Sequence, residues 1–168
     1  MLIIMFPVYW QNPRFISEPF ETDLRSVQTG GPMEAYIRGL VERLRDEHRF
    51  IEVAVVKYLD MLYEKNVEAQ DLFHNTARAI KSAKDHWMRH IRFEENEVFP
   101  LLEGHSIVEE LKAEHREAEA LYSRLEAERD VEKWRTLLRE LLHLKRRHLS
   151  KESRLIFLLE KMTVGLRA

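Results

Sequence analysis

The sequence predicts an all-α protein, built as an antiparallel up-down-up-down four-helix bundle with an irregular N-terminal arm. From Met33 onward, apolar residues recur at helical spacing in four successive segments. Only five glycines and five prolines occur, and three of the prolines precede residue 20. A chain of 168 residues can bury one substantial core but is shorter than two average domains, so we expect a single bundle over residues 33–168.

The predicted arm covers residues 1–32. It combines aromatic residues with prolines and ends in Gly30-Gly31-Pro32, which is typical of a turn. We interpret the arm as a tail packed on the bundle in preference to a lid, and its apolar character also fits a homodimer contact. The apolar start, Met1 to Phe6, lacks the basic residues and the cleavage pattern of a signal peptide. Because no run of ~20 apolar residues follows, the sequence favours the cytoplasm and no membrane partner.

Each helix follows from its own apolar stripe. The first is expected over 33–65, and the second carries a stripe from Leu72 to Val98 and ends at Pro100 or soon after, near Gly104. The third and fourth are expected over 107–127 and about 131–161. The connections are only a few residues long, so successive helices should lie antiparallel.

Charge and cysteine content limit the kinds of site that the chain can hold. Basic and acidic residues nearly cancel to a formal net charge of -2, so nucleic acid is not an expected partner. We interpret the basic stretch Lys145, Arg146, Arg147 and Lys151 as a solvated helix face. The chain has no cysteine, which excludes disulfides, thiolate metal sites and iron-sulfur clusters. Any bound metal must use nitrogen and oxygen ligands.

An internal repeat relates the first two helices to the last two. The first repeated segment is Leu44-Arg-Asp-Glu-His48-Arg49, which matches Leu111-Lys-Ala-Glu-His115-Arg116. The second is His90-x-x-x-Glu94, which matches His148-x-x-x-Glu152. In both copies of the second segment a phenylalanine, Phe99 or Phe157, follows nine residues after the histidine. Each half therefore carries one lone histidine and one His-x-x-x-Glu pair. This pattern predicts a pseudo-two-fold bundle in which four sets of ligands converge.

The repeated residues suit a pair of metal ions. A histidine and a glutamate four residues apart project from one face of a helix, so both can serve one cluster. Two glutamates can bridge two ions while the imidazoles bind each ion from outside, and a bridging oxide or hydroxide with an open position would complete the usual coordination of iron. Manganese, zinc or a mixed pair would use the same ligands. The candidate metal ligands are His48, His90, Glu94, His115, His148 and Glu152.

Two further glutamates have the same spacing. Glu52 and Glu119 lie four residues after His48 and His115, but one step off the apolar stripes of their helices. Two ferric ions with one oxide and two carboxylates would keep a net positive charge, which four carboxylates would cancel. We therefore interpret Glu52 and Glu119 as flanking residues.

The remaining histidines offer weaker candidates. His86, one turn before His90, is either an additional ligand or a partly buried helix histidine, and the second interpretation is favoured. The pair Glu140 and His143 has the spacing of ferritin-like di-iron bundles, but that class needs such a pair on two helices and only one occurs. Two more histidines, His74 and His105, lie near helix ends and are expected to be exposed.

The motifs resemble those of the hemerythrin-like, or HHE cation-binding, family of non-haem di-iron proteins, over about residues 44–160. The resemblance rests on Glu47-His48, His90-x-x-x-Glu94-Glu95 followed by Val98-Phe99-Pro100-Leu101, Glu114-His115, and His148-x-x-x-Glu152 followed by Ile156-Phe157. It implies that the lone histidines and the His-x-x-x-Glu pairs bind two irons and that Glu94 and Glu152 bridge them.

The sequence differs from two groups within this family, and the differences limit which functions the resemblance implies. The oxygen-carrying hemerythrins of marine invertebrates have an extra histidine in the third helix and an aspartate five residues after the last one, where this chain has Ser153. Oxygen carriage of that asymmetric kind is therefore not expected. The iron-sulfur repair members are more similar in ligand pattern, but they usually carry a cysteine-containing N-terminal segment, and this chain has no cysteine.

The sequence thus favours a di-iron protein that binds or senses a small ligand such as dioxygen, nitric oxide or peroxide. One alternative is a di-iron enzyme for peroxide or nitric oxide detoxification or for iron-sulfur repair. Another is a helical interaction module without metal.

Overall fold

The computed structural model describes residues 31–57, 60 and 69–165. Within these ranges every regular element is helical, which confirms the all-α prediction. The elements are α1 (Pro32–Phe50), the π-helix η3 (Ile51–Val56), α3 (Ala69–Phe93), the π-helix η4 (Glu94–Val98), the 3₁₀-helix η5 (Phe99–Leu102), α4 (Ser106–Ala127) and α5 (Val131–Gly165). Residues 1–30, and with them nearly all of the predicted arm, lie outside the described residues. Pro32, expected to close that arm, instead begins α1, where its missing N–H group costs nothing.

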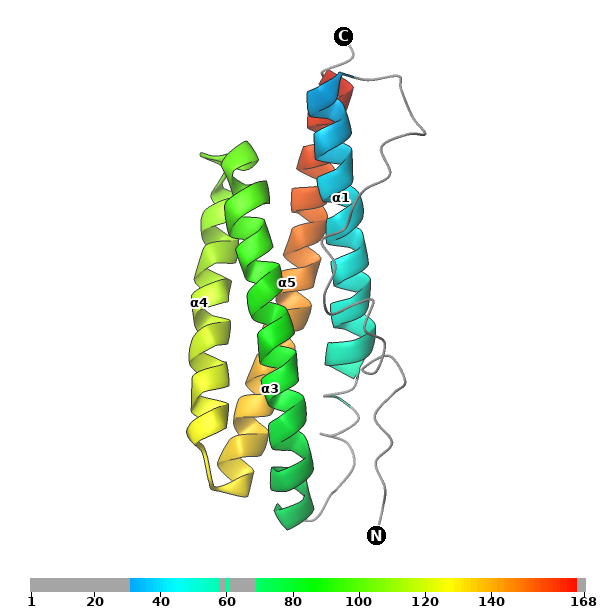
Figure 1. Ribbon diagram of the computed structural model, residues 1–168. Helices are drawn as coiled ribbons and strands as arrows, with labels where there is room; N and C mark the ends of the chain where they lie inside the picture. The colour runs from blue at the N-terminus through cyan, green and yellow to red at the C-terminus, as the bar shows by residue number, and fades with distance from the viewer. Residues whose placement is uncertain (1–30, 58–59, 61–68, 166–168) are drawn as a thin grey trace.

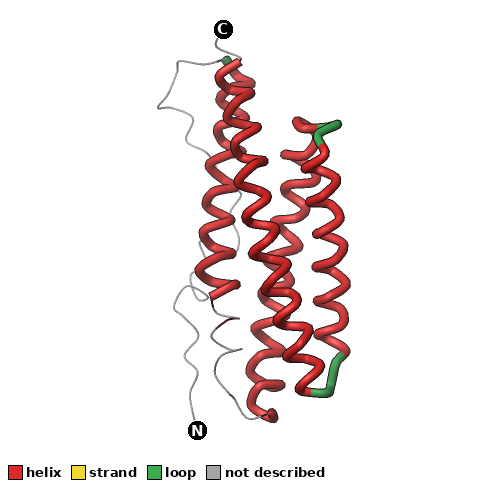
Figure 2. Tube along the Cα trace, turned by 180° about the vertical axis from the view of Figure 1, so that it is seen from behind, coloured by secondary structure: helices red, strands yellow, loops and turns green. Residues whose placement is uncertain are grey.

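The four long helices alternate in direction, as predicted (Figure 1). Helix α5 packs against both α1 and α4, and α3 packs against α4. The view from behind shows the helices lying side by side, with the short α4–α5 loop at one end of the bundle (Figure 2). No helix in the described part of the chain is long and apolar enough to cross a bilayer.

Short connections set the antiparallel arrangement of the second half. Between η5 and α4 the chain turns at Gly104, whose φ of 88° lies in the left-handed region that glycine adopts most easily. Between α4 and α5, Oδ1 of Asp130 accepts a hydrogen bond of 3.0 Å from the backbone N–H of Lys133 and so caps α5.

Two π-helices interrupt the predicted helices. The first predicted helix, 33–65, is the α-helix α1 to Phe50 and continues as η3, and its predicted end lies outside the described residues. The second leaves the α-helical hydrogen-bonding pattern at Glu94, passes through η4, and tightens into η5 around Pro100, which cannot donate a backbone hydrogen bond. Apolar periodicity does not encode such insertions, which occur preferentially at functional sites. The fourth predicted helix, expected to end near 161, continues to Gly165.

Two apolar clusters form the core, one on each side of a polar layer. One cluster includes Ile51, Trp87, Ala118 and Leu144, and the other includes Leu44, Phe93, Leu111 and Leu155. On α1 with η3, α4 and α5 the two clusters use consecutive stretches with the candidate ligands between them, and on the second helix His90 and Glu94 flank the change from one cluster to the other, between Ile91 and Phe93. The bundle therefore holds its polar residues in the middle of its core, enclosed by apolar residues along the helix axes.

Candidate metal centre

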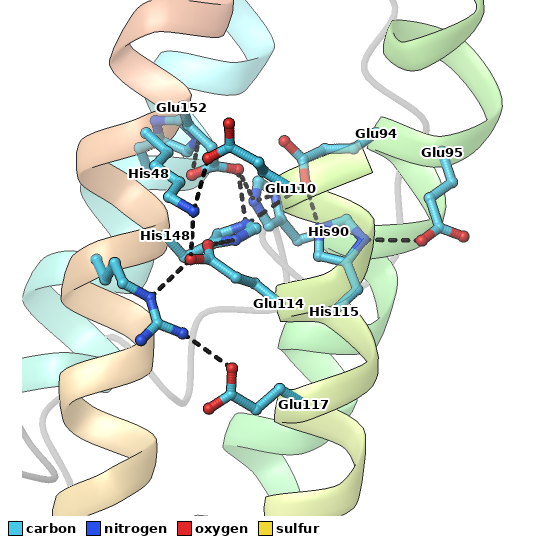
Figure 3. Close-up of polar contacts among 12 residues, drawn as sticks. His48, His90, Glu94, Glu95, Glu110, Glu114, His115, Glu117, His148 and Glu152 are labelled. Atoms are coloured by element: carbon cyan, nitrogen blue, oxygen red, sulfur yellow. Dashed lines mark hydrogen bonds and ion pairs between the residues drawn. The ribbon is translucent and has the colours of Figure 1, made fainter. Parts of the chain in front are cut away.

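The six candidate ligands come together in this central layer (Figure 3). Each of the four long helices contributes one histidine, η4 contributes Glu94 at its first residue, and α5 also contributes Glu152. Both glutamates have fully buried side chains, and only His48 among the six is not classed as buried, with 15% of its side chain exposed. The layer is thus largely sealed from solvent, with its most accessible edge at His48.

The ligand atoms form two adjoining groups that share a glutamate. The first group contains His48, His90, Glu94 and Glu152, and the second contains Glu94, His115 and His148. Within each group the candidate donor atoms all lie within 4.8 Å of one another. Glu152 also reaches the second group, since its Oε1 lies 3.2 Å from Nε2 of His148. Both glutamates therefore stand between two pairs of histidines.

The donor separations match those required around metal ions. Oxygen atoms of Glu152 lie 2.8 Å from Nε2 of His48 and 3.0 Å from Nε2 of His90. On the other side, Oε2 of Glu94 lies 3.0 Å from Nε2 of His115. Two donors bound to one first-row ion at about 2.1 Å, a right angle or somewhat more apart, are separated by about 3.0 to 3.4 Å.

Several buried nitrogen and oxygen atoms that could bind a metal have no hydrogen-bond partner in the described part of the chain. They are Nε2 of His48 and His148, Oε1 of Glu94 and Oε2 of Glu152. Although Nε2 of His48 lies 2.8 Å from Oε2 of Glu152, the two are not aligned as donor and acceptor. Buried polar atoms without partners are costly, and cations held in the two groups would satisfy these four atoms. The donor set of nitrogen and oxygen atoms therefore fits a bound metal.

The electrostatics of the layer also favour positive charge. Burial opposes protonation of His90, but the Glu94 and Glu152 carboxylates outweigh it and raise its pKa to about 10. In the same way, burial is outweighed by Glu152 at His148, whose pKa lies well above its usual value. Burial would raise the pKa of Glu152, yet His148 and His90 hold it well below its usual value. Without a metal, protons must supply the charge that a divalent cation would bring.

Three further glutamates, which we call the supporting carboxylates, bind the outer nitrogen of three of the histidines. Nδ1 of His90 lies 2.8 Å from Glu47, Nδ1 of His115 lies 2.8 Å from Glu95, and Nδ1 of His148 lies 3.1 Å from Glu114. A proton held on Nδ1 by such a carboxylate leaves the lone pair of Nε2 free for a metal and fixes the orientation of the ring. All four histidines point Nε2 toward the shared glutamates.

Basic residues hold two of the supporting carboxylates in place. Nε of Arg43 donates to Glu47 at 2.8 Å. Glu114 lies 2.7 Å from Nε of Arg147 and 3.0 Å from Nζ of Lys151. Burial would raise the pKa of the Glu114 carboxyl, but the hydrogen bonds from His148, Lys151 and Arg147 lower it to about 2.

The fourth histidine has no such support among the described residues. His115 is bound by Glu95, the residue directly after Glu94. In the sequence repeat, the residue at the matching position after Glu152 is Ser153. Ser153 is exposed and its hydroxyl donates to the carbonyl of Leu149 at 3.3 Å. His48 therefore lacks the carboxylate that the pseudo-two-fold would have supplied.

Sequence reasoning did not assign a role to the supporting carboxylates, although a signal was present. Glu47 and Glu114 are the glutamates of the repeated L-x-x-E-H-R segment, each directly before a ligand. Because each binds a histidine on the following helix, the contact could not be read from spacing along one helix.

The other candidates lie outside the two groups. Glu52 and Glu119 are exposed. His86 is half-buried, and its ring packs against Phe50 with 4.2 Å between ring centroids. Burial and the neighbouring Arg89 lower the pKa of His86 to about 4. Two further histidines, His105 and His143, are exposed, and the side chain of His74 lies outside the described part.

The interpretation of Lys145 as part of a solvated face was wrong. Its side chain is fully buried, with 0% exposed, whereas Arg146 and Arg147 are exposed. Lys145 lies four residues after Leu141 and three before His148, so it continues the inward-facing stripe of α5. The basic residues that follow it directly, Arg146 and Arg147, concealed that position.

A helical bundle with two adjoining His/Glu clusters enclosed in its core defines a class of cation-binding helical proteins. Comparison with protein families places the chain more narrowly: the model of the hemerythrin HHE cation binding domain matches residues 39–159, and the chain belongs to that family. This confirms the resemblance seen in the motifs. Searches against curated proteins and against solved structures give no match.

Proposed function

We propose that the protein holds a pair of iron ions in its central layer and uses them to bind or sense a small ligand such as dioxygen, nitric oxide or peroxide. One observation carries the proposal. Two groups of buried donor atoms share Glu94, and Glu152 lies within reach of both. A single ion could not use all four histidines at these separations, whereas two ions sharing the glutamates could.

Each ion would be held by the residues of one half of the bundle. His48 and His90 would bind one ion, His115 and His148 the other, and Glu94 and Glu152 would bridge them. Imidazole with carboxylate suits iron, and the chain has no cysteine to favour softer metals. When bound, an iron pair of this kind, with an oxide or hydroxide bridge, supplies an open position and a change of oxidation state to a small ligand.

The burial of the site supports a small ligand. Both glutamates and three of the histidines are buried, and the side chain of His48 is only 15% exposed. A molecule of two or three heavy atoms can pass such an edge during ordinary side-chain motion, whereas a larger substrate would require the helices to separate.

The test is metal analysis of the purified protein together with its absorption spectrum before and after exposure to air and to azide. We expect about two irons per chain and a near-ultraviolet band that shifts with azide. A protein that folds, contains no metal and cannot be reconstituted with iron would contradict the proposal.

Matched glutamate variants separate a bridging role from a general effect of losing charge. Glu94→Gln and Glu152→Gln keep the side-chain volume but remove the charge between the ions, so we expect loss of metal with retained helicity. Glu52→Gln and Glu119→Gln are the controls, because these residues have the same His-x-x-x-Glu spacing but are exposed. Equal metal content in all four variants would contradict the assignment of ligands.

A further inference from the structure

A second polar group lies in the core directly beside the metal layer. The side chain of Lys145 is fully buried, and its Nζ has no hydrogen-bond acceptor in the described part of the chain. Nζ lies 3.5 Å from the ring centroid of Trp87 and 5.2 Å from that of Tyr122. These contacts with aromatic faces offset part of the cost of burial, but they provide no hydrogen bond.

The two aromatic residues, Trp87 and Tyr122, also have buried polar atoms without a hydrogen-bond partner. Nε1 of Trp87 and the hydroxyl of Tyr122 are buried and have no hydrogen-bond partner among the described residues. All three side chains carry N–H or O–H donors. Trp87 and Tyr122 belong to an apolar cluster of the core, and Lys145 contacts both of their rings. Three buried donors without an acceptor indicate that a group able to accept hydrogen bonds is missing from this place.

The cluster adjoins the candidate ligands. Lys145 lies three residues before His148 on the inward face of α5. The Trp87 ring packs against His148 with 4.9 Å between centroids and against His90 with 5.6 Å. A molecule that reached the metal layer on this side would meet the donors of Lys145 next.

We propose that Lys145, Tyr122 and Trp87 form a donor subsite for a small anion with two or three heavy atoms, of the class of azide, nitrite or hydroperoxide, bound beside the metal layer. The inference rests on the proposed function, since it specifies which small ligands the same layer prefers. A lysine side chain carries N–H donors in both protonation states, so the subsite does not depend on the charge of the free amine. Neutral diatomic ligands gain less from such donors than anions do.

The test compares ligand affinities in the metal-loaded protein by spectral titration. In Lys145→Met the apolar stem is kept and the donors are removed, so we expect azide and nitrite to bind about 10-fold to 100-fold more weakly, with the metal content unchanged. The affinity for nitric oxide should change much less. Tyr122→Phe should weaken azide binding by a smaller factor. Lys161→Met is the matched control, because Lys161 lies on the same helix, near the ring of Phe157, but is exposed.

Each outcome decides between a subsite and a structural lysine. Unchanged azide and nitrite affinity in a metal-loaded Lys145→Met would overturn the proposal and leave a buried water as the missing acceptor. Equal weakening for nitric oxide would also overturn it, because the variant would then act on the metal layer in general. If Lys145→Met does not fold, Tyr122→Phe and Trp87→Phe replace it, because each removes another donor of the subsite, and unchanged anion affinity in both has the same meaning. A wild-type protein that takes up no metal would instead refute the proposed function, which metal analysis reveals separately.

Discussion

The two halves of the bundle carry the same ligand pattern but support it differently. In the α4 and α5 half, both His115 and His148 are buried and both have a supporting carboxylate on Nδ1. In the α1 and α3 half, His90 is held by Glu47, whereas His48 has no such partner among the described residues and is the most exposed of the four. The chain after His48 also leaves the α-helical pattern at Ile51.

This difference teaches that a repeated ligand set does not imply two equivalent ions. A carboxylate on the outer nitrogen raises the basicity of a histidine and fixes its ring, and its loss typically costs about 10-fold to 100-fold in metal affinity. One half has both of its histidines supported and the other has one. We therefore expect the ion between His115 and His148 to be held more tightly.

The largest changes in metal affinity should follow from substitution of the supporting carboxylates. Titration of the metal-free protein with Zn²⁺ by calorimetry should show two binding steps. Glu114→Gln should weaken the tighter step by about 10-fold to 100-fold, because Nδ1 of His148 loses its charged carboxylate partner. Glu47→Gln should act on the weaker step through His90. If both variants changed the same step, or if the wild type bound both ions in one step, the halves would be equivalent and the comparison would fail.

A smaller change in metal affinity should follow from adding a carboxylate beside His48, which lacks one. Ser153 occupies the position after Glu152 that Glu95 occupies after Glu94, and Glu95 binds His115. Ser153→Glu should therefore place an acceptor near Nδ1 of His48 and strengthen the weaker step by about 10-fold. Ser150→Glu, also exposed on α5, adds the same charge without the matching position and should leave both steps unchanged. A response to both substitutions would indicate a general effect of charge.

The repeat predicted the metal layer from sequence because its contacts are encoded within single helices. His-x-x-x-Glu spacing and the apolar stripes bring Glu94 and Glu152 into the core and leave Glu52 and Glu119 exposed. The fold followed from the same periodicity and the short connections. The six residues meet as the repeat required.

What the sequence could not provide depends on contacts between helices. Glu47, Glu95 and Glu114 each bind a histidine of another helix, so their role requires the relative height of two helices. The repeat also overstated the symmetry: Phe99 is 3% exposed, whereas the matching Phe157 is 55% exposed. Lys145 was misplaced because its charge outweighed its position on the stripe, and a charged residue at such a position is itself a signal of function.

The smallest effect is on the pH dependence of stability, and it is expected in only one half of the bundle. His86 belongs to the α1 and α3 half, and burial with the charge of Arg89 lowers its pKa from 6.5 to about 4. Between these values the unfolded chain binds a proton that the folded protein does not, so the free energy of unfolding should fall as the pH is lowered. From pH 7 to 5.5 the contribution is roughly 1 kcal/mol.

His86→Gln should remove this part of the pH dependence, as measured by urea unfolding at both pH values in the same metal state. His143→Gln provides the control from the other half, because His143 is exposed on α5. A wild-type protein that lost no more stability than His86→Gln on acidification would show that His86 is free to protonate in the fold. The packing of its ring on Phe50 would then not restrict it, and the α1 and α3 half would be looser around His48 than its contacts indicate.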